Sequence, residues 1–367
     1  MNKAVIMSAK YAPEHFSHML AYYTLFEAIG CQPTMLLDDG YEDFKKDYTG
    51  YQYASFHEIR SVQADILLIY NMSTKDVKTI RNLKKHNPGM KVLFVYHEPW
   101  FGYAKWRDDL RCGRESWKDS VKTLGRYFFA KSLLKNTDTV LLPSGKAEEY
   151  YQKFCAKING NYAVFPLVFT DEAKESGCCE KKYFSFISTV QNSKNFTMFL
   201  DYVRYKSGKD ASALFQIATR SDISAFLDKP LRELIGQKRL IVNHAHSLSN
   251  EEINRAYAVS NCTWMLYSRS TQSGALCKSF MFGAPVIASD TGSFREVVNA
   301  DNGILLSGAY SLGEIDQAYE SIKRDLPRLS RGARETFLRA FYCGAHVERF
   351  RELINALKAG SEKLNEE

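Results

Sequence analysis

The stretch Trp264–Leu306, WMLYSRSTQSGALCKSFMFGAPVIASDTGSFREVVNADNGILL, decides the fold class of this chain. An apolar run, WMLY, leads into a polar loop, a helical pattern, ALCKSFMF, a second apolar run, PVIA, and a glycine turn. Strands that alternate with helices in this way are typical of an α/β protein whose parallel sheet is covered on both faces. Ligands bind outside the carboxyl ends of such strands, so we expect a site in the two loops of this stretch.

The first of these loops has the composition of an anion site. Small and hydroxyl-bearing residues stand where the helix begins, and the free backbone N–H groups and the helix dipole favour a phosphate there. The predicted phosphate-binding residues are Thr271, Gln272, Ser273 and Gly274.

The same stretch resembles the donor-binding half of the GT-B glycosyltransferases, in particular the retaining family-four type (glycosyl transferases group 1), which uses nucleotide-activated sugars. Ser273–Leu276 falls on the family's GFGL-like turn, and Gly283–Ser289 falls on its GxPVIAS motif. Thr291–Ser293 falls on its glycine turn, and Glu296 on the glutamate that follows. The resemblance covers most of the chain in the order of elements, and only this stretch carries specific motifs.

Two positions depart from the family pattern. Ser270 and Lys278 stand where the family has two glutamates eight residues apart. The carboxylate contacts to the sugar and to the ribose are therefore not carried over to this chain.

Length and composition suit two domains. The chain has 367 residues, of which 45% are hydrophobic and 25% charged, enough for two ordinary cores. The resemblance implies two Rossmann-like domains that face each other across a cleft. We expect an acceptor-binding domain at 1–168, a linker at 169–181, a donor-binding domain at 182–340, and a C-terminal helix within 341–367 that packs back on the first domain.

Apolar runs mark the expected strands of both domains, and longer amphipathic patterns mark helices at His15–Ile29, Ser73–His86 and Val347–Leu364. The expected strands are Lys3–Ser8, Thr34–Leu37, Ala64–Tyr70, Lys91–Tyr96, Thr139–Pro143, Tyr183–Ser188, Ala213–Thr219, Arg239–Val242, Thr263–Tyr267 and Pro285–Ala288.

Cations for a diphosphate are expected near the start of the second domain. In the family an arginine and a lysine neutralise the donor diphosphate, and Lys194 matches that lysine. Thr189 stands at the arginine position, so Arg220 or Lys278 takes its place. Preorganised cations stabilise the charge that develops as the diphosphate leaves, without a metal ion. The alternative is that these lysines are solvated surface cations, as most lysines are.

Acid–base candidates gather after the strands of the first domain. Glu14, His15 and His18 follow the first strand, and His97 follows a later one; these residue types move protons near pH 7. His97 matches a histidine that the family places near the donor sugar, so we rank it first, with His18 and Glu14. The alternative is a histidine packed at a strand end. The resemblance implies a retaining enzyme, whereas a base in the first loop would suit an inverting one.

Two further histidines, His244 and His246, precede the helical pattern SLSNEEINRAYAVSN. By resemblance they border the nucleobase pocket. Loop histidines that simply face solvent are the alternative.

Residues 100–135 mix large aromatic side chains with nine Lys or Arg and four Asp or Glu. Together with the net charge of +7, this composition predicts docking on an anionic membrane surface, where a lipid-linked acceptor would be found. The alternative is one or two amphipathic helices whose aromatic residues fill the core of the first domain and whose basic side faces solvent.

Other classes of protein are disfavoured. The N-terminus predicts a strand and no signal peptide, and no apolar run reaches the length of a membrane span. The eight cysteines are scattered, as in a reduced cytoplasmic protein, and form no metal motif. No recognisable nucleic-acid-binding module is present.

We therefore expect a metal-independent, hexosyltransferase-like glycosyltransferase that needs no cofactor. It would move a sugar from a nucleotide-sugar to a glycan or lipid-linked glycan in cell-surface polysaccharide synthesis, such as that of lipopolysaccharide or capsule. We expect it in the cytoplasm, peripheral on the inner face of the membrane. Because both glutamates are replaced, the alternative is a catalytically degenerate GT-B protein that binds a nucleotide-sugar or a protein partner without transfer.

Overall fold

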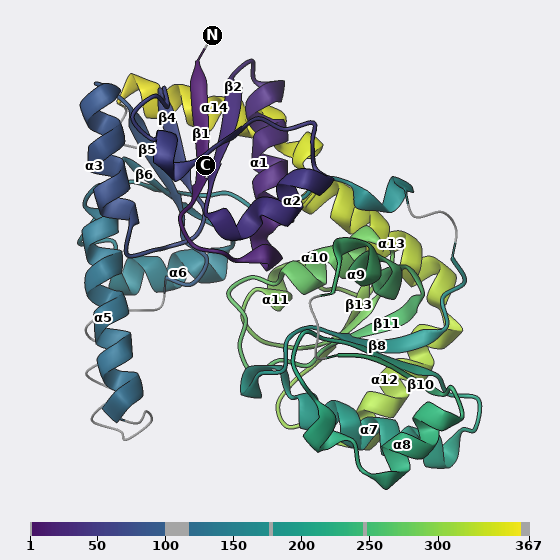
Figure 1. The fold of residues 1–367 in the computed structure, drawn as a ribbon. Helices are drawn as coiled ribbons and strands as arrows, with labels where there is room; N and C mark the ends of the chain where they lie inside the picture. The colour runs from purple at the N-terminus through teal and green to yellow at the C-terminus, as the bar shows by residue number, and fades with distance from the viewer. Residues whose placement is uncertain (1, 100–116, 176–178, 245–247, 361–367) are drawn as a thin grey trace. The chain divides into compact units, whose positions relative to one another are not determined.

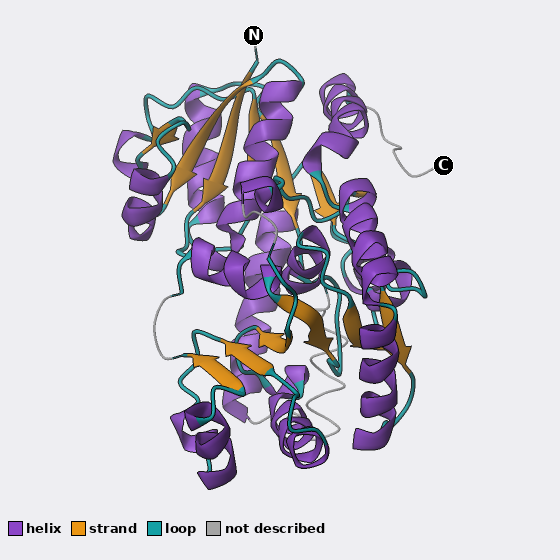
Figure 2. Cartoon of the chain, turned by 90° about the vertical axis from the view of Figure 1, so that its right-hand side faces the viewer, coloured by secondary structure: helices purple, strands orange, loops and turns teal. Residues whose placement is uncertain are grey.

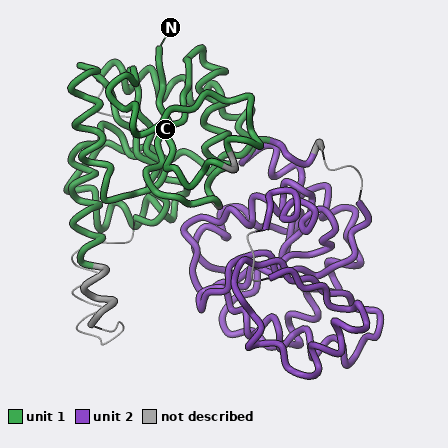
Figure 3. Tube along the Cα trace, viewed as in Figure 1, with its two compact units in different colours: residues 1–170, 342–367 green, residues 171–341 purple. Residues whose placement is uncertain are grey.

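The computed structural model describes residues 2–99, 117–175, 179–244 and 248–360. The chain divides into two compact units (Figure 3). Unit 1 comprises Met1–Thr170 and Tyr342–Glu367, and unit 2 comprises Asp171–Phe341.

Unit 1 is built on a seven-stranded parallel sheet with the order β3-β2-β1-β4-β5-β6-β7. The order reverses between β1 and β4, as in a Rossmann-like domain. The strands are β1 (Lys3–Ser8), β2 (Gln32–Leu37), β3 (Tyr53–Ala54), β4 (Ile66–Ile69), β5 (Lys91–Val95), β6 (Thr139–Leu142) and β7 (Tyr162–Val164).

Helices cover both faces of this sheet (Figures 1 and 2). Alternate residues of β4 enter different cores: Ile66 and Leu68 lie in one core, and Leu67 and Ile69 lie in the core on the other face of the sheet. A strand buried on both faces is continuously apolar, which explains the ILLI run. The helices of unit 1 are α1 (Phe16–Ala28), α2 (Glu42–Asp47), α3 (Asp76–His86), α5 (Trp117–Leu134), α6 (Gly145–Phe154) and α14 (Val347–Ala359).

Unit 2 repeats this plan with a six-stranded parallel sheet, in the order β10-β9-β8-β11-β12-β13. Its strands are β8 (Tyr183–Ile187), β9 (Phe215–Ala218), β10 (Leu240–Asn243), β11 (Ser260–Met265), β12 (Val286–Ser289) and β13 (Gly303–Leu306). Its helices are α7 (Phe196–Lys209), α8 (Lys229–Gly236), α9 (Asn250–Ala258), α10 (Gly274–Met281), α11 (Phe294–Val297), α12 (Leu312–Arg324) and α13 (Leu326–Ala340).

The predicted fold class, two Rossmann-like α/β domains, is confirmed. Every expected strand is present within a few residues of its predicted bounds, whereas β3, β7 and β13 were not predicted. In the described part of the chain, no helix combines the length and the apolar character that crossing a bilayer requires.

Candidate functional site

The reversal of strand order in unit 2 creates the first candidate site. The chain leaves β8 toward β9 and leaves β11 toward β12, so the segments that follow these two neighbouring strands diverge. Two hydrogen bonds hold them together at the base: Ser268 N donates to Ser193 O (2.8 Å), and Trp264 Nε1 donates to Lys194 O (3.1 Å). Crevices at such a switch point are where ligands bind in open parallel sheets.

Lys194 places an ammonium group at this point. Its Nζ donates to the hydroxyls of Ser188 and Thr189, the latter at 3.2 Å, just beyond the end of β8. The same Nζ lies 5.7 Å from the centre of the Tyr267 ring. This side chain is half-buried and anchored at the strand end, unlike the freely solvated lysine of the alternative.

Asn195 supports Lys194 and was missed by the sequence analysis. Its backbone has a φ of 50°, which turns the chain from the loop into α7, and its Nδ2 donates to Leu266 O (2.7 Å). An Asn tolerates this left-handed conformation better than most residues, which is the signal that the sequence offered.

The loop between β11 and α10 lies on the other side of the switch point. Ser273 caps α10, since its Oγ accepts from Leu276 N at 3.2 Å, and α10 begins at Gly274. The amide oxygen Oε1 of Gln272 is buried and has no hydrogen-bond partner among the described residues. An unmet acceptor of this kind suits a hydroxyl or amide donor from a ligand.

The glycine turn after β12 packs directly against this loop. Ser293 N donates to Ser270 O (3.1 Å), and the hydroxyls of these two serines are 3.1 Å apart. A Cβ on Gly292 would lie 1.8 Å from Ser270 O, so only glycine allows the two loops to meet. Glu296 follows on α11 and is exposed.

Lys278 lies in a buried network and is no solvated cation. Its Nζ donates to Glu172 Oε2 (3.1 Å), Asn250 Oδ1 (2.6 Å) and Asn254 Oδ1 (2.8 Å). Both asparagines in turn donate to Glu172 Oε2 at 2.6 Å. An ammonium has three N–H donors, and these three contacts match that number.

Burial lowers the pKa of Lys278, and Glu172 opposes this effect while Arg220 adds to it. Burial raises the pKa of Glu172, but Lys278 and the two asparagines outweigh it and hold that pKa below 4.5. Arg220, which follows β9, thus lies near the network, and its Nη2 donates to Leu248 O at 3.5 Å.

Unit 1 has its own switch point, between β1 and β4, and histidines gather there. The ring of His15 stacks on that of His97 with centroids 5.1 Å apart, and His18 lies 6.1 Å from His15. Tyr70 contacts all three rings. The structure therefore brings His18 and His97 together, with His15 between them.

Hydrogen bonds orient two of these rings. His15 Nδ1 contacts Oδ1 of Asn71, and Nδ2 of Asn71 donates to Ser8 Oγ (2.9 Å). His18 Nδ1 lies 3.1 Å from Val168 O, an acceptor, so this nitrogen carries the proton. Asn71 was missed because its role depends on β1 and β4 being adjacent, although its place directly after a buried strand was visible.

His97 is held in its neutral form. Both of its ring nitrogens are buried. Burial, together with the neighbouring His15 and His18, lowers the pKa of His97 well below 6.5. A neutral imidazole at a strand end can accept a proton or polarise a hydroxyl.

Some predicted residues cannot be placed. The side chain of Glu14 and all of His246 lie outside the described residues, as do residues 100–116. His244 is described: its Nδ1 accepts from Ile223 N at 3.3 Å, which fits a role in shaping its loop.

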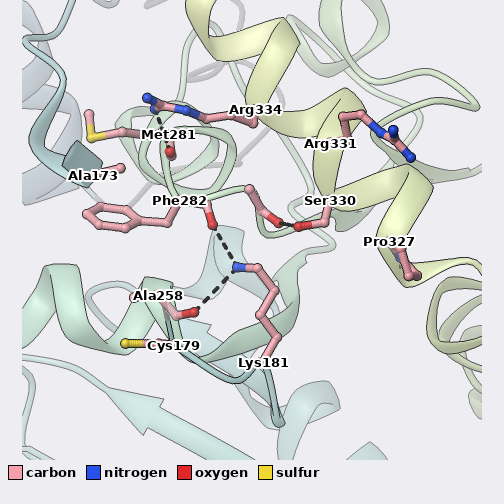
Figure 4. A pocket seen from close by; sticks show the side chains of 11 residues that line it. Ala173, Cys179, Lys181, Ala258, Met281, Phe282, Pro327, Ser330, Arg331 and Arg334 are labelled. Carbon is pink, nitrogen blue, oxygen red and sulfur yellow. Dashed lines mark hydrogen bonds between the residues drawn. The ribbon is translucent and has the colours of Figure 1, made fainter. Parts of the chain in front are cut away.

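A pocket in unit 2 lies near the start of β8 (Figure 4). Two of the three cations that line it are bound by protein groups: Lys181 donates to Phe282 O (2.6 Å) and Ala258 O (3.4 Å), and Arg334 pairs with Asp171. These two side chains therefore hold neighbouring segments of unit 2 together. In the described ranges, no group of three or more His, Cys, Asp or Glu side chains is arranged to hold a metal ion.

Comparison with solved structures identifies the fold. HepE from Anabaena, crystallised with UDP-glucose, has a TM-score of 0.65 at 11% identity, over 97% of this chain and 100% of HepE. A glycosyltransferase from Rickettsia africae has a TM-score of 0.66 at 11% identity, over 98% and 99%. A sucrose-phosphate synthase from Thermosynechococcus elongatus has a TM-score of 0.62 at 14% identity, over 98% and 100%.

No protein-family profile and no curated protein sequence matches the chain. The similarity is therefore one of fold, and it extends over nearly the whole chain. This chain has the GT-B glycosyltransferase fold, which confirms the resemblance found in its sequence.

Proposed function

We propose that this chain is a nucleotide-sugar-dependent glycosyltransferase whose donor binds to unit 2. One observation carries the proposal: an anchored ammonium, Lys194, and the capped start of α10 flank the same switch point of a parallel sheet. Backbone N–H groups and a cation are the partners that a diphosphate requires. The HepE structure with UDP-glucose supports this assignment by its fold.

Roles follow for the predicted donor residues. We assign binding of the diphosphate to Lys194, Arg220 and the loop Thr271–Gly274. The buried oxygen of Gln272 would accept a hydrogen bond from a hydroxyl of the nucleotide-sugar. Glu296, exposed on α11 at the same sheet edge, is assigned to the sugar. Lys278 acts through Glu172 instead, as a positioning residue that ties η4 (Glu172–Glu175) to α9 and α10.

Unit 1 would bind a glycan or lipid-linked glycan acceptor. In the transfer, the bond between the anomeric carbon and the diphosphate oxygen breaks, and the acceptor oxygen forms a new bond to that carbon. The acceptor proton goes to the leaving phosphate in a retaining reaction, or to a base such as His97, His18 or Glu14 in an inverting one. We favour a retaining, metal-independent reaction in cell-surface polysaccharide synthesis, on the resemblance of the donor segment.

The experiment incubates the full chain with UDP-, GDP- and dTDP-sugars, with and without glycan or lipid-linked acceptors. The quantity measured is the free nucleoside diphosphate released. Acceptor-dependent release supports a transferase. Binding of a nucleotide-sugar without any release would instead favour the alternative, a catalytically degenerate binding protein. The observation that favours this alternative is the replacement of the family glutamates by Ser270 and Lys278.

A further inference from the structure

Helix α5 exposes two adjacent phenyl rings. Phe128 is 57% exposed and Phe129 47% exposed, the highest values for any large hydrophobic side chain among the described residues. On the opposite side of the same helix, Ala130, Leu133 and Leu134 are buried in the core of unit 1. The alternative that the aromatic residues of this segment fill the core is therefore wrong for both phenylalanines.

All the charged residues that flank these two rings in the sequence are basic. Residues 120–137 contain four Lys or Arg and no Asp or Glu. Arg126 and Lys135 are exposed, and Lys131 lies with its Nζ 5.9 Å from the Tyr127 ring. Exposed aromatic rings beside cations with long apolar stems are the arrangement that binds an anionic bilayer, because the rings enter the interface while the cations meet the headgroups.

Helical spacing extends the pattern toward the start of α5. Leu124, four residues before Phe128 and therefore on the same side of the helix, is also apolar and is only partly buried. Exposed apolar side chains of this kind are not required for binding a nucleic acid. A convex helix also lacks the basic groove that a single strand would follow.

We propose that the outer face of α5, centred on Phe128 and Phe129, docks the protein on an anionic lipid surface. Lipid docking is separate from the transfer reaction, and its test does not depend on whether unit 2 binds a nucleotide-sugar. For an enzyme with a lipid-linked acceptor, such docking would place unit 1 at the surface that carries its substrate.

The test is co-sedimentation of the full chain with vesicles of phosphatidylcholine alone or with 30% phosphatidylglycerol (about the anionic content that gives a biological surface potential), at low and moderate salt. We expect binding to the anionic vesicles that weakens with salt. The double variant Phe128→Ser with Phe129→Ser should reduce the partition coefficient of the protein between vesicles and buffer about tenfold. The matched control is Phe226→Ser with Leu338→Ser, which removes two exposed apolar side chains of unit 2 and should bind like the wild type.

A charge-reversal pair tests the cations separately. Lys131→Glu with Lys135→Glu should abolish the preference for anionic vesicles, whereas Lys229→Glu with Arg339→Glu, an equal change in net charge on unit 2, should leave most of it. Three results would overturn the proposal: no binding of the wild type at low salt, equal binding by the phenylalanine variant, or a wild-type dimer that this variant makes monomeric. The last would identify the face as an interface between copies.

Discussion

Gly292 packs directly against the backbone of Ser270 and leaves no room for a side chain. A Cβ at position 292 would lie 1.8 Å from the Ser270 carbonyl oxygen. Their contact joins the glycine turn after β12 to the loop before α10. The shape of the proposed phosphate site therefore depends on a position that need not contact any ligand.

Replacing Gly292 by alanine should displace the loop before α10. The φ of Gly292 is 55°, so alanine adds backbone strain to the steric clash, and we expect a loss of about 1–3 kcal/mol of stability together with weaker nucleotide binding. Gly308→Ala is the control, because Gly308 has a similar φ of 69° and open space around its Cα. Equal effects of both substitutions on nucleotide affinity would show that the contact with Ser270 is unimportant.

The pair formed by Lys278 and Glu172 should make unit 2 sensitive to acid. The pKa of Glu172 is lower in the folded chain than in the unfolded one, so this carboxylate stabilises the fold above pH 4.5, and that contribution is lost as the pH falls further. Glu172→Gln should remove this part of the pH dependence and, by leaving Lys278 buried without its counter-ion, cost about 3–5 kcal/mol near pH 7.

Urea unfolding of the wild type and Glu172→Gln between pH 7 and pH 3 measures both effects. Glu180→Gln is a control, since Glu180 is exposed and its pair with Lys182 lies at the surface. If Glu172→Gln unfolds at the same urea concentration as the wild type at pH 7, the network does not stabilise unit 2.

The neutral state of His97 predicts a different pH response. The unfolded chain binds a proton at this histidine near pH 6.5, whereas the folded chain does not, so stability falls as the pH drops below 6.5. His97→Gln should flatten this slope between pH 7.5 and pH 5.5 and should lower sugar transfer while donor binding persists. The exposed His86 provides the control, as His86→Gln. Normal turnover by the His97 variant would exclude it from the reaction.

The predictability of this fold from sequence varies from element to element. The segment from β11 to α11 was predictable because apolar strands, a hydroxyl-rich loop and a glycine turn follow one another locally. By contrast, β3 and β7 have two and three residues and are half-buried at the edges of a sheet, so no apolar run marks them. β13 was overlooked because its short GILL run follows a turn and ends partly exposed.

The site was predictable only where a residue type alone carries the chemistry. Lys194 and the histidines became candidates in this way. The contrast between Lys194, anchored at a strand end, and Lys278, buried against Glu172, depends on contacts across 106 residues that spacing does not reveal. For the same reason the orienting role of Asn71 toward His15, 56 residues away, required the structure.

The central claim is tested most directly by isothermal titration calorimetry. The affinities of UDP, GDP and dTDP are measured for the wild type, Lys194→Ala and Lys229→Ala. Lys229 is exposed on unit 2 and serves as the charge-matched control. We predict that at least one nucleotide binds the wild type and the control equally, and that Lys194→Ala weakens its affinity about tenfold or more, as expected for the loss of a charged hydrogen bond. Failure of all three to bind the wild type, or unchanged affinity in Lys194→Ala, would contradict a diphosphate site at the switch point of unit 2.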